Sequence, residues 1–341
     1  MTLTIARPVS TGTALDRIAE ECEVRADDAF RCGAIDVRRP ADAAAADAAA
    51  GAAAWLPRAL ATALYRHYYL GIPDAAPAAP DRRPVFARED PSLGRRLRAA
   101  NASVAHWEEG WEVVAGGPEG FLVSRQGLRL HVTEDEVRPA PPAIGAPVAV
   151  RFPADRPYAS PGFYLTVSSR GPVAPAEGLA RWYVAVTAEG APALFGAVTS
   201  SLDALGVRFV AKVLNDPASY PRPDAGVVYV RRCDVGRVAP ALLGIAAEHA
   251  GALDNRVPSF TRRLRRGLAI ADDPSSTGRP MSFGQHRCGV IARGLVAAGA
   301  ESTADARRLA ILDAIRAESL DPDRLHLNPH TPEFAIEEAS Q

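Results

Sequence analysis

Residues 207–232 read VRFVAKVLNDPASYPRPDAGVVYVRR, a sequence that predicts two strands joined by a proline-rich turn. Apolar side chains alternate with polar ones on both sides of the turn, which is the period of a β-strand. Because successive side chains of a strand point to opposite faces, Arg208 and Lys212 share one face, and Phe209 and Val213 share the other. The second face is apolar, so this stretch predicts a sheet with one buried face and one charged face.

Lys212 is the only lysine among the 39 lysine and arginine residues of the chain. Two explanations stay open. The chain is rich in alanine, arginine and proline, as the product of a GC-rich genome would be, and lysine codons are scarce in such genomes. Alternatively, position 212 needs lysine chemistry, because arginine stays protonated whereas a lysine amine made neutral by burial or neighbouring cations can accept a proton.

The bulk composition is that of a globular protein. The chain has 341 residues, enough for one large or two ordinary domains, with 48% hydrophobic and 23% charged residues. A formal net charge of -1 argues against nucleic acid and anionic membranes as partners. No secretory signal is predicted, and the alanine-rich run at 41–64 predicts a soluble helix rather than a membrane span. We therefore expect a cytoplasmic protein that holds any anionic ligand with a local cluster of arginines.

The cysteines predict neither a metal site nor a disulfide framework. Cys22, Cys32, Cys233 and Cys288 form no CxxC pair and have no histidine at metal-ligand spacing. We expect buried thiols in a reducing compartment and no metal or organic cofactor. Cys288 follows a histidine and an arginine in GQHRC, so a reactive thiol there is the alternative.

The order of the predicted elements indicates an α+β protein in three regions. Residues 1–90 predict a helical N-terminal region, with helices over 12–70 and a proline-rich linker over 72–91. Residues 91–175 predict a small antiparallel β-rich region, and 176–341 a C-terminal α/β domain with a mixed sheet flanked by helices. The last third predicts helices over 237–253, 258–268, 284–299 and 303–318.

Two further predicted strands extend the charged face around the lysine. Arg181 and Tyr183 share one face of RWYVAV, and Tyr229 and Arg231 share one face of VVYVRR. If these strands lie beside the strand of Lys212, five basic and phenolic side chains gather without a carboxylate. A solvated sheet face also alternates in this way, and that interpretation stays open. Arginine forks bind phosphate, and their positive field disfavours the charged form of a nearby lysine, so the set suits proton abstraction beside a phosphate.

The same stretch resembles a known family. Together with GFYLTVSS and RWYVAVT before it and SFGQHRC after it, it is similar to the HopA-type effector-like proteins of bacteria, over about residues 160–300. Through them it resembles the type III effector phosphothreonine lyases, in which a basic-x-His strand, a catalytic lysine strand, a phosphate-binding arginine and a Tyr-x-Lys strand follow one another. Arg181-x-Tyr183, Lys212, Arg222 and Tyr229-x-Arg231 occupy those places here.

The resemblance implies β-elimination of phosphate from phosphothreonine or phosphoserine. Lys212 would remove the Cα proton, and the phosphate would be held by a set of basic and phenolic side chains: Arg181, Arg222, Tyr229, Arg231 and Arg287. Tyr183 stands where those lyases have the histidine that protonates the leaving phosphate. His286 in SFGQHRC is a second candidate for the acid, with a structural histidine near a helix start as the alternative.

The resemblance also implies a setting for the reaction. A stand-alone HopA-like protein is similar to the lyase partners of class V lanthipeptide and thioamitide biosynthesis, in which a separate kinase first phosphorylates the precursor peptide. The expected partners are therefore a phosphorylated precursor peptide, with leader and core, and a peptide kinase. The competing hypothesis is a non-catalytic module that binds a peptide or a protein.

Overall fold

The N-terminal region combines helices with a small sheet. The computed structural model describes residues 11–40, 55–72, 89–157, 159–174, 177–274 and 281–336. The first elements are α1 (Thr11–Glu21), β1 (Cys22–Ala26), β2 (Ala29–Cys32), β3 (Ile35–Arg38), α3 (Trp55–Leu64) and the π-helix η2 (Tyr65–Tyr69). The predicted all-helical stretch 12–70 is therefore wrong over 22–38, where three strands pair antiparallel in the order β1-β2-β3. Most of the expected linker at 72–91 falls outside the described residues.

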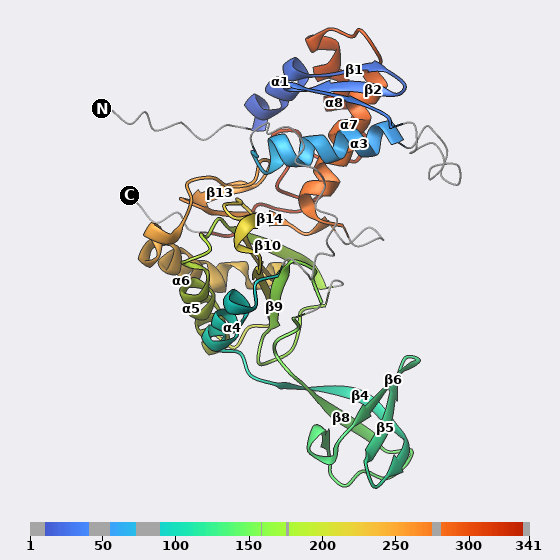
Figure 1. The fold of residues 1–341 in the computed structure, drawn as a ribbon, viewed down its shortest axis with the longest axis vertical. Coiled ribbons are helices and arrows are strands. Elements are labelled where there is room, and N and C mark those ends of the chain that lie inside the picture. The colour runs from blue at the N-terminus through green and yellow to red at the C-terminus, as the bar shows by residue number, and fades with distance from the viewer. Residues whose placement is uncertain are drawn as a thin grey trace.

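The middle of the chain forms a sheet with a core of its own. Its elements are α4 (Pro91–Ala100), β4 (His106–Gly117), β5 (Gly120–Arg125), β6 (Leu128–Val132), η4 (Glu134–Glu136), β7 (Val137–Arg138) and β8 (Pro147–Phe152). The strands pair antiparallel in the order β6-β5-β4-β8-β7 around buried Trp111, Val113 and Val123. Figure 1 shows this sheet projecting from the rest of the molecule on the two segments that lead into β4 and out of β8.

A six-stranded sheet forms the centre of the molecule. The remaining elements are β9 (Phe163–Val167), β10 (Leu179–Val184), α5 (Ala191–Ala204), β11 (Phe209–Leu214), η6 (Pro217–Ser219), β12 (Gly226–Arg231), η7 (Arg232–Asp234), α6 (Val235–Glu248), η8 (Ala250–Ala252), β13 (Arg262–Arg265), β14 (Leu268–Asp272), α7 (Phe283–Ala298) and α8 (Ala304–Ala317). The strand order is β13-β14-β10-β12-β11-β9. Every pair in this order is antiparallel, so the α+β class is confirmed while the expected mixed sheet is corrected to an antiparallel one.

The two faces of the central sheet pack against different partners. Phe209, Ala211 and Val213 of β11 lie on the face that packs against α5 and α6, as the alternation in the sequence predicts. The opposite face contributes Tyr183 and Val227 to a second core, shared with the N-terminal helices and with α7 and α8. Figure 1 shows α5 and α6 on one side and the N-terminal elements with α7 and α8 on the other. The face that carries Lys212 is therefore partly covered by protein.

One predicted helix is a hairpin. Residues 258–268 predict a helix, but β13 and β14 form an antiparallel pair there. Gly267 has a φ of +60°, a left-handed conformation that turns the chain between the two strands. Leu268, Ala269, Ile270 and Ala271 are all buried because β14 lies inside the sheet with both faces covered. The basic run TRRLRRG that precedes it is consequently on a strand and its turn.

Helix starts follow the local sequence. Asp90 accepts a hydrogen bond from the backbone N–H of Leu93 at 2.6 Å and begins α4. Ser282 and Gln285 form a reciprocal capping box that begins α7, which places His286 and Arg287 in the first turns of that helix. Within the described part of the chain, no helix combines the length and the apolarity needed to cross a bilayer.

Candidate functional site

Lys212 lies between two aromatic rings on the covered face of the sheet. In the register of β11 it stands opposite Val227 of β12 and Leu165 of β9. Its Nζ atom is 4.5 Å from the ring centre of Phe163 and 5.8 Å from that of Tyr229. Both distances allow a cation–π interaction. The half-buried amino group makes no ion pair with a carboxylate of the described residues.

Arg181 approaches the same tyrosine from the neighbouring strand. It stands opposite Tyr229 in the β10–β12 register, and its guanidinium carbon is 5.2 Å from the centre of the Tyr229 ring. The side chain is buried, pairs with Asp273 and donates to the carbonyl oxygen of Met281 at 2.9 Å. Burial lowers the pKa of Arg181, but Tyr183, Tyr229 and Asp273 together raise it above its ordinary value. Arg181 is thus a fixed cation that reaches Tyr229 from the side opposite Lys212.

Tyr183 lies deeper than Arg181. The residue is 3% exposed, and its ring centre is 6.3 Å from that of Phe283. Burial raises the pKa of the Tyr183 phenol, while the nearby Arg181 opposes that shift, so the hydroxyl keeps its proton at neutral pH. The Tyr183 hydroxyl lies near Arg181 and Tyr69, yet neither it nor Arg181 Nε has a well-formed hydrogen bond within the described residues. Such groups are costly to bury and are suited to a polar ligand.

The π-helix η2 covers this part of the sheet with tyrosines. Tyr65 and Tyr69 stack with ring centres 5.1 Å apart, and Tyr69 lies 6.2 Å from Phe283. The Tyr65 hydroxyl donates to Asp224 at 3.2 Å. Burial is the main cause that raises the pKa of the Tyr65 phenol, and Asp224 adds to it. Residues far apart in sequence therefore meet over the face that carries Lys212.

Arg222 is held by a carboxylate. It follows the cis peptide bond between Tyr220 and Pro221 and binds Asp224 with two hydrogen bonds, Nε to Oδ1 and Nη2 to Oδ2, each 2.9 Å long. Burial lowers the pKa of Arg222, but Asp224 outweighs it and the pKa is raised. A phosphate would accept the same two hydrogen bonds from the Arg222 guanidinium, so Asp224 occupies the position that a phosphate would take.

Arg231 lies on the same face but farther from the lysine. It stands opposite Leu179, one pleat beyond the Arg181–Tyr229 pair. Its Nε donates to Asp234 at 2.7 Å, and Glu177 lies 3.9 Å from Nη1. The charge of Arg231 is therefore already balanced by the turn that follows β12.

Half-buried His286 and buried Arg287 lie side by side at the start of α7. Arg287 is 1% exposed and donates to the carbonyl oxygens of Leu325 at 2.8 Å and Leu327 at 2.7 Å. Burial lowers its pKa to about 10. Burial, assisted by Arg287, lowers the pKa of His286 to about 4, and the ring Nδ1 lies 2.9 Å from Arg287 Nη1. His286 is thus neutral at pH 7, and Arg287 ties the C-terminal segment to α7.

The structure brings together part of the expected set. Lys212, Tyr229, Arg181 and Tyr183 occupy adjacent positions on three strands, with Arg222 in the β11–β12 turn. Several neighbours were not singled out from the sequence as site residues: Phe163, Asp224, Asp273, Tyr65 and Tyr69. The two tyrosines belong to YRHYYLG, a run dense in aromatic residues, and such a run is typical of a packed or binding surface.

Other chemistry finds little support in the geometry. Cys288 is buried, and burial raises the pKa of its thiol, which is the opposite of what a reactive cysteine needs. The described ranges contain no group of three or more histidine, cysteine or acidic side chains placed to hold a metal ion.

Known proteins place the chain in a family. The sequence profile of the HopA1 effector protein family matches residues 154–327, which is half of the chain and includes β9 to α8. The chain belongs to the HopA1 effector protein family. No curated protein shows significant sequence similarity to this HopA1 family member.

Two solved structures resemble it. One is an effector protein from Pseudomonas syringae pv. tomato strain DC3000, at 15% identity and a TM-score of 0.46, covering 79% of this chain and 90% of that one. The other is an effector protein from Pseudomonas syringae pv. syringae strain 61, at 16% identity and a TM-score of 0.45, covering 94% and 98% of the two chains.

Proposed function

We propose that this protein is a phosphothreonine and phosphoserine lyase. The observation that carries the proposal is the placement of Lys212, the only lysine of the chain, beside Tyr229 and Arg181 with no carboxylate of the described residues bound to its amine. A lysine that serves as a base needs its nitrogen free of a salt bridge, because a bound carboxylate stabilises the protonated form. Family membership adds support, since the profile match includes all of these strands.

The proposed reaction is an elimination that needs one base and one anion site. The neutral amine of Lys212 takes the Cα proton of the phosphorylated residue, and the electrons of that C–H bond form the Cα–Cβ double bond. The Cβ–O bond breaks, and its electron pair leaves with the phosphate. The products are dehydrobutyrine from phosphothreonine or dehydroalanine from phosphoserine, a phosphate ion, and a protonated Lys212.

Positive charge near the leaving group supplies the electrostatic stabilisation. Arg181 and Arg222 are the candidates that the geometry favours, because both lie at the edges of the patch that contains Lys212 and Tyr229. A phosphate bound there would compete with Asp224 for the guanidinium fork of Arg222. Arg231 lies one pleat beyond the Arg181–Tyr229 pair, and Arg287 is buried against backbone carbonyls at the start of α7, so we assign them no contact with the phosphate.

A phenol is the better candidate for the acid. His286 is neutral at pH 7 because its pKa is lowered to about 4, so it has no imidazolium proton to give. Tyr183 keeps its proton but is packed beneath Phe283. Tyr229 is only half-buried and lies between Lys212 and Arg181, so we assign the donation of a proton to the leaving phosphate to Tyr229.

The substrate class follows from the resemblance described above. We propose a phosphorylated precursor peptide of a lanthipeptide-type natural product as substrate, a separate peptide kinase as the enzyme that supplies it, and the cytoplasm as the compartment. No metal or organic cofactor enters the proposed chemistry.

Mass spectrometry of a phosphothreonine precursor peptide, with its leader region, tests the proposal. We expect the wild-type protein to remove the mass of phosphoric acid. Lys212→Arg keeps a cation but loses the base, so its rate should fall by at least about a hundredfold, the usual contribution of a general base. Arg208→Gln, on the same face before β11 begins, is the matched control and should retain activity. An unchanged phosphopeptide with the wild-type protein would contradict a lyase.

A second function is favoured by the ion pairs. Arg181 and Arg222 are both neutralised by aspartates, and Tyr183 is buried, as expected for a protein that binds a peptide without acting on it. In that case the precursor peptide binds with its phosphate retained, and Lys212→Arg binds as well as the wild type. The same incubation, followed by a binding measurement, separates the two functions.

A further inference from the structure

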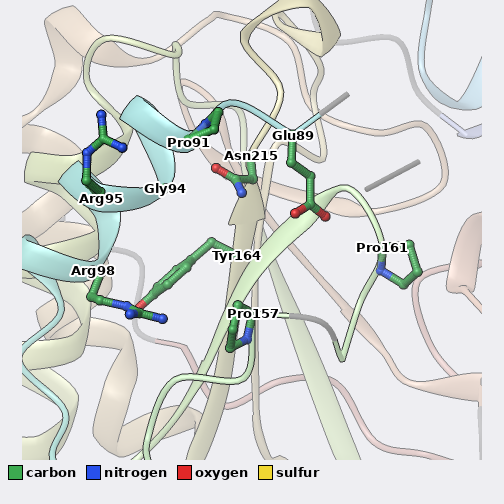
Figure 2. Close-up of a pocket in the computed structure, with 9 residues that line it drawn as sticks. All are labelled: Glu89, Pro91, Gly94, Arg95, Arg98, Pro157, Pro161, Tyr164 and Asn215. Carbon is green, nitrogen blue, oxygen red and sulfur yellow. The ribbon is translucent and has the colours of Figure 1, made fainter. Parts of the chain in front are cut away.

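A pocket of 670 Å³ lies on the other face of the central sheet. Figure 2 shows its lining residues on α4, in the loop before β9, on β9 and just after β11. Tyr164 faces it from β9, opposite Val213 in the register, whereas Lys212 points to the other side of the sheet. No part of the site described above lines this pocket.

Two buried polar atoms of the pocket lack a well-formed hydrogen bond. The hydroxyl of Tyr164, a residue that is 2% exposed, lies near Arg98 and Asn101 without good hydrogen-bond geometry, and Oδ1 of Asn215 makes no hydrogen bond within the described residues. Leaving a buried polar group unpaired costs about 1–3 kcal/mol, so such atoms are expected where a ligand supplies the missing bond. The Asn215 amide rests against Gly94, whose missing Cβ would lie 3.3 Å from Oδ1. Asn215 thus presents a hydrogen-bond acceptor and a donor side by side, which suits a peptide backbone.

The walls combine arginine with proline. Arg95 and Arg98 lie three residues apart on α4 and therefore on one face of that helix. Arg98 is held by Asp155 at 2.9 Å, while Arg95 is exposed and pairs with no carboxylate of the described chain. Pro157 and Pro161 form a rigid apolar wall opposite the helix (Figure 2). Glu89 also lines the pocket, and its Oε1 accepts a hydrogen bond from the backbone N–H of Gly162 at 3.2 Å. Because Glu89 and Asp155 balance part of the positive charge, Arg95 is the cation left for an acidic side chain, beside the apolar prolines and in a segment whose backbone meets Asn215.

The pocket and the lysine are close along the chain. Asn215 lies three residues after Lys212, roughly 10 Å along an extended strand. At the edge strand β9, the Phe163 ring contacts Lys212 while the next residue, Tyr164, faces the pocket. Residues 154–156 bond to the outer edge of β9 from Leu165 to Val167, so a peptide that reaches both places would pass the beginning of β9 at Phe163.

We propose that this pocket binds an acidic and apolar segment of the peptide substrate, a few residues away from the phosphorylated one. The proposal rests on the proposed function for the identity of the peptide, but binding at the pocket does not require turnover. It assigns Arg95, Tyr164 and Asn215 to peptide recognition.

The probe is a fluorescein-labelled decapeptide with a Glu-Leu-Pro-Glu core, measured by fluorescence anisotropy with the full chain. We expect it to bind about tenfold more tightly than the same peptide with glutamine in place of glutamate, as charge-assisted hydrogen bonds to arginine require. Arg95→Glu and Asn215→Ala should each weaken the acidic probe by about tenfold, and Tyr164→Phe, which keeps the ring, by about threefold. Arg96→Glu is the matched control, because it reverses the same charge on α4. The wild-type Arg96 side chain lies outside the pocket and donates to the carbonyl oxygen of Glu189.

Each outcome decides between the proposals. Equal binding of the two probes, no binding of the acidic one, or equal losses in Arg95→Glu and Arg96→Glu would overturn the pocket assignment. Lys212→Ala should bind the probe as the wild type does. If the protein binds the probe but does not eliminate phosphate, the lyase proposal is wrong and the pocket proposal is supported. If the protein eliminates phosphate but does not bind the probe, the lyase proposal is supported and the pocket proposal is wrong.

Discussion

At the scale of single residues, the basic side chains of the candidate site differ in whether a carboxylate already pairs with them. Arg181, Arg222 and Arg231 each pair with an aspartate, whereas Lys212 contacts only aromatic rings among the charged and aromatic groups described around it. A phosphate that binds one of these arginines must therefore replace a carboxylate. Asp224 is the one whose replacement can be tested directly, because it holds Arg222 in the two-bonded fork that a phosphate would use.

Asp224→Asn should strengthen the binding of inorganic phosphate. The amide keeps the size of the side chain but removes the competing negative charge, so we expect an increase in affinity of about threefold to tenfold, within the range of one charge-assisted hydrogen bond. Phosphate titrations followed by calorimetry measure it. Asp216→Asn, in the same loop and bonded to Ala218 and Ser219, is the matched control with the same change in net charge. Identical affinities for the two variants would show that Arg222 does not meet phosphate.

His286 makes the stability of the protein depend on pH. Its pKa is lowered from 6.5 to about 4 in the folded chain, chiefly by burial, so between these values the unfolded chain binds more protons at this position. This residue therefore costs stability progressively as the pH falls from 6.5 to 4 and costs none above that range. His286→Gln should lose less of its free energy of unfolding than the wild type between pH 7 and pH 4, as urea titrations would show. Equal losses of unfolding free energy in the wild type and in His286→Gln would mean that the His286 ring is solvated in the folded protein.

At the scale of secondary structure, strands whose sequence alternates apolar with polar residues were predictable, including the fully buried β10, whereas the uniformly apolar β14 was not. The alternation in β10, β11 and β12 placed Lys212, Arg181, Tyr183 and Tyr229 correctly on one face, because each strand has a purely apolar opposite side. The arginines before Leu268 mimic a helical face, and LAIA is too short to distinguish a buried strand from a buried helix. The carboxylate partners Asp224 and Asp273 lie in a turn and at a strand end, and hydrophobic periodicity does not predict the geometry of such segments.

The turn between β13 and β14 depends on a glycine. Gly267 has a φ of +60°, and a Cβ there would lie 2.5 Å from the carbonyl oxygen of Asp254. Gly267→Ala should therefore lower the free energy of unfolding by about 1–3 kcal/mol, the cost of a strained backbone conformation. Gly289→Ala is the contrasting variant, because Gly289 lies inside α7 with no atom within 4 Å of the added Cβ, and it should stabilise the protein by about 0.5–1 kcal/mol. Urea unfolding measures both, and a neutral Gly267→Ala would contradict the turn.

At the scale of the whole molecule, the face that carries Lys212 is built by segments from both ends of the chain. The core that contains Tyr183 and Val227 also contains Leu64 and Tyr69 from the N-terminal region and Ile311 and other residues of α7 and α8. The division at residues 90 and 175 stays a prediction, but this shared core makes the catalytic proposal depend on the N-terminal elements. A fragment that begins at residue 176 would lack β9 as well, and with it the Phe163 ring beside Lys212.

The β4–β8 sheet, in contrast, should be removable. Its core around Trp111 and Val123 is separate from the two cores of the central sheet, and its ends lie side by side because His106 pairs with Phe152. Replacing residues 107–151 by a short glycine-serine linker should leave the remainder folded, with a melting temperature within about 2–4 °C of the wild type, the shift that corresponds to 1 kcal/mol in a domain of about 150–250 residues. His106 is kept because it packs against Gly171.

Tryptophan fluorescence measures the result. Of the four tryptophans, Trp107 and Trp111 leave with the excised sheet, so Trp55 and Trp182 report on the N-terminal region and on the central sheet. Both are tied to the cores on either side of the central sheet, so a single cooperative transition is expected from them in the shortened protein. Loss of that transition would mean that the central sheet needs the β4–β8 sheet to fold. A retained transition together with retained elimination of phosphate would place all of the chemistry in the remaining chain, and a retained transition with lost elimination would assign the excised sheet to substrate binding.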